Sequence, residues 1–171
     1  MCGPYTGEAE HHGSYPLNHV GVSVPDLDKA VEWYINVLGF HELRARSSSD
    51  RATNPEGGIF QIYPESLQKV RMAYLSAGNG VGFELFEFSS PKMTTDEQAN
   101  FEKNYVRGGY FHIAVTTPEL EATLEKIVAF GGRQIGKIVP VYGHKAAYVA
   151  DPWGNVVELI TASFERTMAN R

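Results

Sequence analysis

Apolar residues alternate with small or polar ones in two short stretches of the chain. Valine occupies positions 20, 22 and 24 in the first stretch, and Phe, Ile and Val occupy positions 111, 113 and 115 in the second. This period of two is typical of a strand with one buried face. Apolar residues at helical spacing follow each stretch, over 27–38 and 120–128. The pattern therefore predicts a strand and then a helix in both places.

The two stretches belong to an internal repeat that runs without a gap. The segment L-N-H-V-G-V-S-V-P-D-L from Leu17 returns as Y-F-H-I-A-V-T-T-P-E-L from Tyr110. The offset between His19 and His112 is 112 − 19 = 93, and the proline and the helix-ending glycine of each copy share it. Because a repeat decides the architecture, the chain is expected to contain two copies of one structural module.

Three further strands are expected after each helix, where apolar runs are bounded by turn residues. These strands are 40–46, 70–77 and 81–88 in the first half, and 134–139, 145–150 and 155–161 in the second. Each half is therefore expected to be a βαβββ module. The predicted fold class is α+β, with the two tandem modules forming one curved eight-stranded mixed sheet around a central cavity.

The two modules are expected to form a single domain over residues 17–162. The polar stretch 46–56 is rich in turn formers, which predicts an inserted loop. This loop and the polar linker between the modules are either plain surface features or parts of a substrate lid. The expected boundaries are 1–16 for an N-terminal tail, 17–88 for module one, 89–108 for the linker with one short helix, 109–162 for module two and 163–171 for a C-terminal tail.

Composition and charge narrow the class of protein. The chain has 171 residues, of which 43% are hydrophobic and 20% charged, as in an ordinary globular domain. Its net charge of −5 argues against nucleic acid or an anionic membrane as the partner. The single cysteine, Cys2, cannot form an internal disulfide, and no apolar run approaches the roughly 18 residues of a membrane span. With no secretory signal in the first 16 residues, a cytoplasmic protein with a small-molecule substrate is expected.

The histidines of the repeat are candidates for a shared chemical role. The alternating apolar residues must pack against the helices, so His19 and His112 project from the opposite face of their strands, beside small residues. A single histidine of this kind is more often a core residue bonded to a backbone carbonyl, but two at equivalent positions are not. The last strand of each module also carries an acid, Glu84 or Glu158, inside an apolar run. An unpaired charge there is costly, so each needs either a basic side chain or a metal ion.

The two modules, if they close around a pseudo-two-fold axis, bring His19, Glu84, His112 and Glu158 to one metal cavity. Imidazole and carboxylate ligands suit Zn²⁺, Ni²⁺, Co²⁺, Mn²⁺ or Fe²⁺ at a site with open positions. A divalent ion there would act as a Lewis acid on the oxygens of a bound substrate.

The chain resembles the vicinal-oxygen-chelate superfamily, which includes glyoxalase I, extradiol dioxygenases and bleomycin-binding proteins. The resemblance covers about 17–162 and rests on N-H-V-G-V-S-V-P-D-L, F-H-I-A-V and D-P-W-G-N-V-V-E-L. The metal positions that it implies are the four residues named above, and it also implies a homodimer. The complete ligand set is most similar to that of glyoxalase I. This implies an isomerase or lyase in which Glu158 moves a proton between neighbouring carbons, with Glu84 as its symmetric counterpart.

Four further residues are candidates for substrate binding. Ser23 stands where glyoxalase I has an arginine for the glutathione carboxylate, so a different substrate is expected. Phe86 and Phe88 share the face of Glu84 and either wall a substrate cavity or pack in the core. Tyr148, in Y-V-A-D-P-W-G-N-V-V-E, fits part of the extradiol dioxygenase motif, but packing favours the interpretation as an aromatic core residue.

Two alternative functions remain open at this point. The first is an extradiol-type ring-cleaving dioxygenase, although Glu84 would fill the open face that such an iron site needs. The second is a metal-free drug-binding protein of the bleomycin-resistance type, which needs no metal ligands.

Overall fold

The computed structural model describes residues 15–94 and 101–169, so all but the last two residues of the expected N-terminal tail lie outside the described part. Module one contains β1 (His19–Ser23), α1 (Leu27–Leu38), β2 (His41–Asp50), α2 (Gly58–Ile62), β3 (Lys69–Ser76) and β4 (Gly82–Ser90). Between the modules lies α3 (Phe101–Asn104). Module two contains β5 (Ile113–Thr116), α4 (Leu120–Ala129), β6 (Arg133–Val141), β7 (His144–Ala150) and β8 (Val156–Ile160), and α5 (Phe164–Met168) follows it. No helix in the described ranges is both long enough and apolar enough to cross a membrane.

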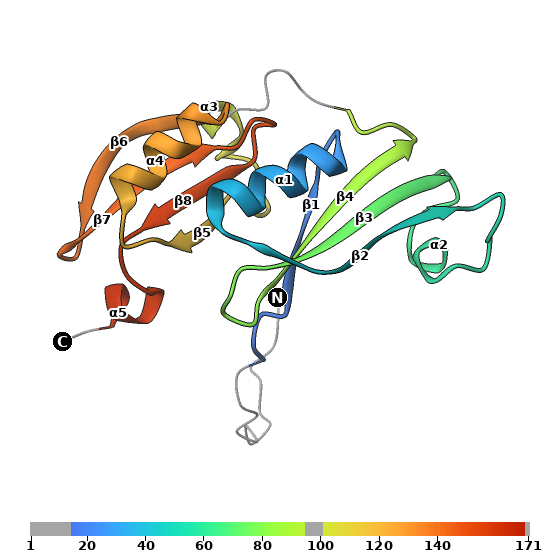
Figure 1. Ribbon diagram of the computed structural model, residues 1–171, viewed down its shortest axis with the longest axis horizontal. Coiled ribbons are helices and arrows are strands. Elements are labelled where there is room, and N and C mark those ends of the chain that lie inside the picture. The colour runs from blue at the N-terminus through green and yellow to red at the C-terminus, as the bar shows by residue number, and fades with distance from the viewer. Residues whose placement is uncertain (1–14, 95–100, 170–171) are drawn as a thin grey trace, which may run out of the picture.

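The eight strands form two mixed sheets with the same topology. The strand orders are β1-β4-β3-β2 and β5-β8-β7-β6, with a parallel first pair in each sheet and antiparallel pairs after it. This confirms the α+β class and the tandem βαβββ modules. The sheets are not joined into one eight-stranded ladder, because β1 and β5 remain edge strands of separate sheets in the described part of the chain. Figure 1 shows the two sheets side by side, with α1 between them and α4 across the strands of module two.

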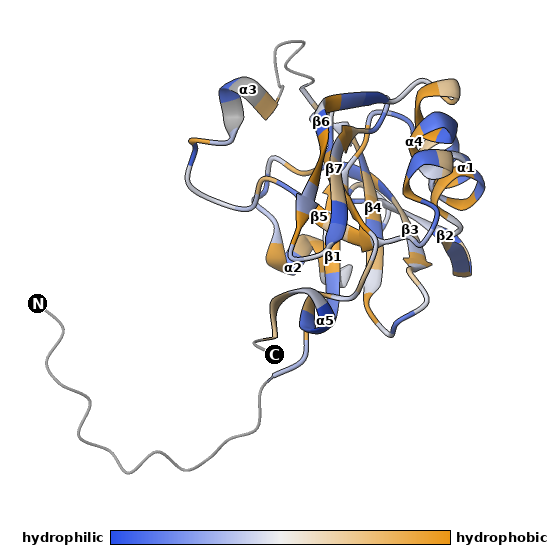
Figure 2. Cartoon of the chain, turned by 90° about the vertical axis from the view of Figure 1, so that its left-hand side faces the viewer, coloured by the Kyte–Doolittle hydropathy of each residue, from blue (hydrophilic) through white to orange (hydrophobic). Residues whose placement is uncertain are grey.

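The first module shows why these residues form a helix on a sheet. Asp26 caps α1, where its carboxylate accepts from the backbone N–H of Lys29 at 3.1 Å. The helix ends at Gly39, whose φ of 73° lies in the left-handed region that glycine adopts without strain. Its apolar face packs on β3 and β4, and α4 does the same on β6 and β7. Figure 2 shows both helices on one side of the sheets, which leaves the other side of each sheet free for a site.

Three contacts from α1 hold the modules together. The indole N–H of Trp33 donates to the carbonyl of Phe130 at 3.0 Å, and its ring lies edge-on to Trp153. The hydroxyl of Tyr34 donates to the Asp151 carboxylate at 2.8 Å, where both side chains are buried. Asp151 also accepts from the two backbone N–H groups and the one side-chain amide that complete its D-P-W-G-N turn. A buried carboxylate with four donors is well satisfied, so these contacts fix how the modules sit.

The expected inserted loop over 46–56 is wrong in its first half. Strand β2 runs on to Asp50, because Ser47, Ser48 and Ser49 pair with β3. Serine and aspartate favour turns in isolation, but pairing with a neighbouring strand overrides that local preference. The rest of the insertion turns at 51–57 and forms α2, while the other predicted strand ends agree with the structure to within two residues.

Candidate metal centre

Module one places His19 and Glu84 side by side on neighbouring strands. The parallel register of β1 and β4 sets Gly21 opposite Glu84, and the His19 Nε2 atom lies 3.6 Å from the Glu84 Oε2 atom. The other ring nitrogen of His19, Nδ1, lies 2.8 Å from the Asn18 Oδ1 atom. That contact orients the imidazole so that Nε2 faces the carboxylate. Module one therefore brings two of the four predicted metal ligands, His19 and Glu84, next to each other.

Module two repeats the arrangement in a more buried setting. The His112 Nε2 atom lies 3.3 Å from the Glu158 Oε2 atom. The His112 ring packs edge-on against Phe111 and Tyr148, and its Nδ1 atom is buried with no hydrogen-bond partner in the part of the chain that the structure describes. The ring nitrogen that has a polar neighbour is therefore the one that faces Glu158.

Among the described residues, neither glutamate has the Lys or Arg partner that a purely structural ion pair would need. In the described ranges, Glu84 and Glu158 form no ion pair with Lys or Arg, and each faces the histidine of its own module. Glu87, which lies on the opposite face of β4, is the contrasting case, because it pairs with Arg71 at 3.0 Å. Glu84 and Glu158 therefore differ from Glu87 in having histidine, and no Lys or Arg, as the ion-pair partner among the described residues.

The phenol of Tyr148 distinguishes the two halves of the candidate centre. It donates to the Glu158 Oε2 atom at 3.1 Å, and burial together with the adjacent Glu158 charge raises the pKa of Tyr148 to about 12. Tyr74 stands opposite Glu84 in the same register, but its hydroxyl lies 3.3 Å from the Ser47 hydroxyl instead. Tyr74 is a site residue that the sequence analysis missed. The signal was there, because the offset between the tyrosines, 148 − 74 = 74, equals that between the glutamates, 158 − 84 = 74.

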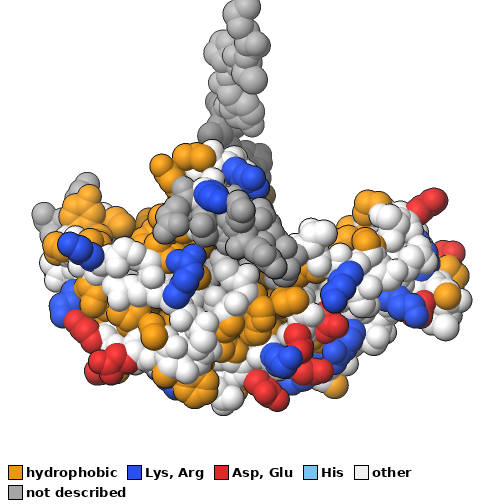
Figure 3. Space-filling view, turned by 90° about the horizontal axis from the view of Figure 1, so that it is seen from above, with side chains coloured by type: hydrophobic (Ala, Val, Ile, Leu, Met, Phe, Trp, Pro, Cys, Tyr) orange, Lys and Arg blue, Asp and Glu red, His pale blue; other side chains and the backbone are white. Residues whose placement is uncertain are grey.

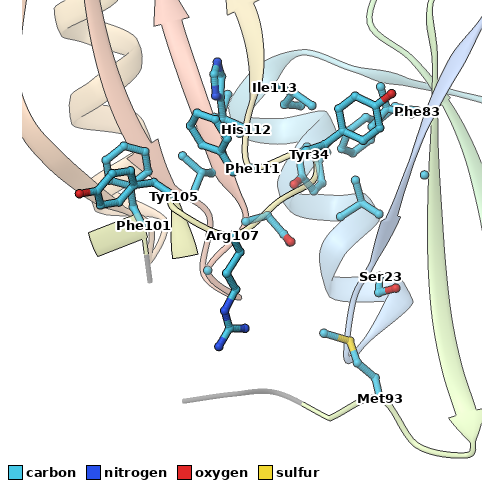
Figure 4. A pocket seen from close by; sticks show the side chains of 18 of the residues that line it. Ser23, Tyr34, Phe83, Met93, Phe101, Tyr105, Arg107, Phe111, His112 and Ile113 are labelled. Carbon is cyan, nitrogen blue, oxygen red and sulfur yellow. The ribbon is translucent and has the colours of Figure 1, made fainter. Parts of the chain in front are cut away.

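The two pairs remain separate within one chain. In the residues that the structure describes, no three His, Cys, Asp or Glu side chains come close enough to hold one ion. A cavity of about 520 Å³ lies between β1 and module two, and His112 and Ser23 are among its lining residues. Figure 4 shows Ser23 and Arg107 on different sides of this cavity, with His112 above them. Convergence of all four candidate ligands therefore needs something beyond the fold of a single chain.

The candidate substrate residues divide between different surroundings. Phe86 lines a cavity that also contains His19 and Glu84. Phe88 stacks on Phe86 with an interplanar angle of 9° and packs against the small core under α2, so it supports that wall without lining the cavity. Ser23 stands opposite Phe86 in the parallel register of β1 and β4, but it lines the other cavity, beside module two.

Comparison with known proteins gives a consistent picture. Residues 16–159 match the family model described as the Glyoxalase/Bleomycin resistance protein/Dioxygenase superfamily. A curated relative from Actinomyces sp, named 2-epi-5-epi-valiolone epimerase, is 31% identical over 154 residues, covering 86% of this chain and 80% of the relative. A protein from Vibrio cholerae, named probable lactoylglutathione lyase, is 28% identical over 149 residues, covering 86% of this chain and 91% of the relative.

Solved structures share the fold at lower sequence identity. A glyoxalase family protein from Bacillus cereus superposes with a TM-score of 0.70 at 17% identity, covering 91% of this chain and 98% of its own. The trypanothione-dependent glyoxalase I of Leishmania major has a TM-score of 0.56 at 22% identity, covering 91% of this chain and 90% of its own. At these identities the likeness concerns the fold alone.

Proposed function

Because the chain belongs to the glyoxalase/bleomycin resistance protein/dioxygenase superfamily, we propose that it is a metal-dependent, glyoxalase-like isomerase or lyase of a small carbonyl compound. The observation that carries this proposal is the pair of repeat-equivalent contacts, His19 with Glu84 and His112 with Glu158, neither supported by a basic side chain. The relatives named as an epimerase and as lyases have the same broad type of activity.

The residues of each pair suit a divalent ion. Two ligands that are each about 2.1 Å from one ion, at neighbouring positions, lie roughly 3 Å apart. The Nε2–Oε2 separations of 3.6 Å and 3.3 Å are close to that value. In module one the second ring nitrogen of His19 is engaged by Asn18, which leaves Nε2 as the donor atom. A bound divalent ion would act as a Lewis acid that acidifies a C–H group next to a substrate carbonyl.

A second copy of the chain is proposed to complete the site. Each module holds two ligands, and the buried contacts of Tyr34 and Trp33 fix the modules so that the pairs stay apart. A two-fold dimer would join His19 and Glu84 of one copy to the complementary pair of the other, giving two sites per dimer. The edges of β1 and β5 are unpaired in the described residues, and such edges are sites for pairing with another chain.

Exposed apolar side chains support this association. The segment between α3 and β5 exposes four large ones, which are Tyr105, Val106, Tyr110 and Phe111. Figure 3 shows hydrophobic side chains near the middle of the face seen from above, between the two ends of the molecule. Clusters of this kind on a protein surface mark interaction sites.

The two glutamates would carry the proton. Glu158 is proposed as the base that takes a proton from the carbon beside the carbonyl, and Glu84 as its counterpart across the completed site. Tyr148 holds Glu158 through the 3.1 Å hydrogen bond and so acts as a positioning residue, while Tyr74 leaves Glu84 without such a donor. A carboxylate held in one orientation meets its substrate at lower entropic cost.

Hydrogen–deuterium exchange in D₂O tests this function directly. The protein loaded with Ni²⁺ is incubated with a panel of α-hydroxy ketones, and loss of the C–H signal beside the carbonyl is followed by NMR. We expect exchange that falls at least a hundredfold in Glu158→Gln. Oxygen consumption with catechols would instead support the dioxygenase alternative, for which Tyr148 beside Glu158 is the favouring observation. Failure to take up any divalent metal would support the metal-free binding protein.

A further inference from the structure

A separate cavity begins at the His19–Glu84 pair and extends across the open face of module one. Its volume of about 640 Å³ is within the usual range for small-molecule pockets. Residues of β2, β3 and β4 line it on one side, and the insertion around α2 lines it on the other. Figure 2 shows α2 on the side of the sheet away from α1, over the same face as the candidate ligands. The first-half insertion is therefore part of the wall of the site.

The α2 wall has a small core of its own. Phe60 is only 5% exposed and packs with Leu67 and Val70. The guanidinium of Arg51 lies over the Phe60 ring and donates to the Leu67 carbonyl at 2.7 Å. A cation over an aromatic ring and a buried aromatic anchor together hold the segment in place. The cavity is thus formed before any ligand arrives.

The polar groups of this cavity are neutral, apart from the His19–Glu84 pair. Hydroxyl and amide groups can each donate and accept, so they complement a ligand hydroxyl in either role. The ring of Phe86 adds an apolar surface for the C–H face of a ligand. The neutral polar lining residues are Ser47, Ser49, Asn54, Tyr63 and Tyr74.

Among the described residues, no Lys or Arg side chain lines the cavity, and those around it are engaged by other groups. Three basic residues of the bordering strands pair with acids outside the cavity, in the contacts Arg46–Asp28, Arg71–Asp28 and Lys69–Asp50. Arg44 does not line the cavity and lies over the ring of Tyr74, which does. A carboxylate or phosphate on the part of the ligand that lies away from the His19–Glu84 end would therefore lose water without gaining a counter-charge.

We propose that this cavity binds a neutral, polyhydroxylated ring compound of monosaccharide size, such as a cyclitol ketone. Ser49 and Asn54 are its specificity-determining residues, because they lie on or just after β2, the strand farthest from β1 in the sheet. The inference rests on the proposed function, which places the reacting carbonyl at the His19–Glu84 end. Sites built to bond hydroxyl groups discriminate strongly against ligands that lack them.

Ligand binding to the full-length protein tests the proposal. The probes are inosose (the ketone of myo-inositol), glucose phosphate and S-lactoylglutathione, each titrated by calorimetry and saturation-transfer NMR with and without Ni²⁺. We expect inosose to bind and both anions to fail at the same concentration. Ser49→Ala and Asn54→Ala should each weaken inosose binding about five- to tenfold, as for one lost hydrogen bond. The matched control is Ser48→Ala, on the opposite face of β2, which should change nothing.

Two results would overturn the inference. One is tighter binding of either anion than of inosose, and the other is inosose binding that Ser49→Ala and Asn54→Ala both leave unchanged. Failure of the proposed function would look different, since no metal would bind and no ketone would exchange its proton, while inosose still bound in a Ser49-dependent way. Proton exchange on another ketone without inosose binding would remove the cyclitol inference and leave the proposed function standing.

Discussion

Tyr34→Phe tests the contact that fixes the two modules relative to each other. The Tyr34 hydroxyl donates to Asp151 at 2.8 Å, and the two residues are 0% and 3% exposed. The substitution keeps the ring and removes one hydrogen bond to a carboxylate, which is worth about 1.5–3 kcal/mol. We therefore expect the free energy of unfolding at pH 7 to fall by about 2 kcal/mol.

Urea unfolding followed by circular dichroism measures this change. With an m value of about 2 kcal/mol/M, a loss of about 2 kcal/mol lowers the midpoint by about 1 M and leaves m unchanged. Tyr142→Phe is the matched control, because Tyr142 is 80% exposed. Its effect should stay below about 0.5 kcal/mol.

The loss of unfolding free energy in Tyr34→Phe, called the deficit below, should depend on pH because of Asp151. Burial raises the pKa of Asp151, while hydrogen bonds from Asn155 and Tyr34 oppose the shift. Because its folded pKa lies above the unfolded one, its contribution to stability is present at low pH and is lost as the pH rises through the folded pKa. Removing the Tyr34 donor raises that pKa further, so the deficit should be full at pH 7 and shrink as the pH falls. A deficit under about 0.5 kcal/mol at pH 7, or one that does not shrink at acidic pH, would refute the reasoning.

Two other substitutions probe the candidate site and the packing of module two. Tyr148→Phe should lower the maximal rate of deuterium exchange about tenfold, because Glu158 loses the hydrogen bond that positions it. Tyr74→Phe should change that rate less than twofold, because the Tyr74 hydroxyl bonds to Ser47 and not to Glu84. Gly132→Ala should cost about 1–3 kcal/mol in urea unfolding, because a Cβ there would lie 2.7 Å from the Ala150 carbonyl oxygen. Gly108→Ala, where a Cβ meets nothing within 4 Å, is its control, and equal effects of the two would contradict the packing argument.

The repeat made much of this molecule predictable. Strand alternation followed by helical spacing placed both βα units, and the offset of 93 placed His19 and His112 at equivalent positions. Each histidine lies beside the glutamate of its own module on a neighbouring strand, whereas the alternation and the repeat predict all four side chains at one cavity. Local patterns of this kind are set by the period of the backbone, so one sequence is enough to read them.

Other features depended on contacts that no local pattern records. The buried hydrogen bond of Asp151 is one example, because its donor, Tyr34, lies 117 positions away in the chain. The serines of β2 are another example. Their local sequence favours a loop, and only their pairing with β3 makes them part of a strand. The separation of the two His–Glu pairs likewise follows from how the modules pack, which the repeat alone does not determine.

The central claim is that one metal site forms between two copies of the chain. A double variant His19→Ala/Glu84→Ala and a second one, His112→Ala/Glu158→Ala, are each purified, then co-refolded in equal amounts, and bound Ni²⁺ is measured after gel filtration. Neither variant alone should hold the metal. Random mixing makes about half of the dimers contain one chain of each kind. In such a dimer one site combines the two intact pairs and the other combines the two mutated pairs, so the mixture should bind about a quarter of the wild-type amount of Ni²⁺. Wild-type protein that binds Ni²⁺, together with a mixture that binds none, would place the site within a single chain and contradict the account.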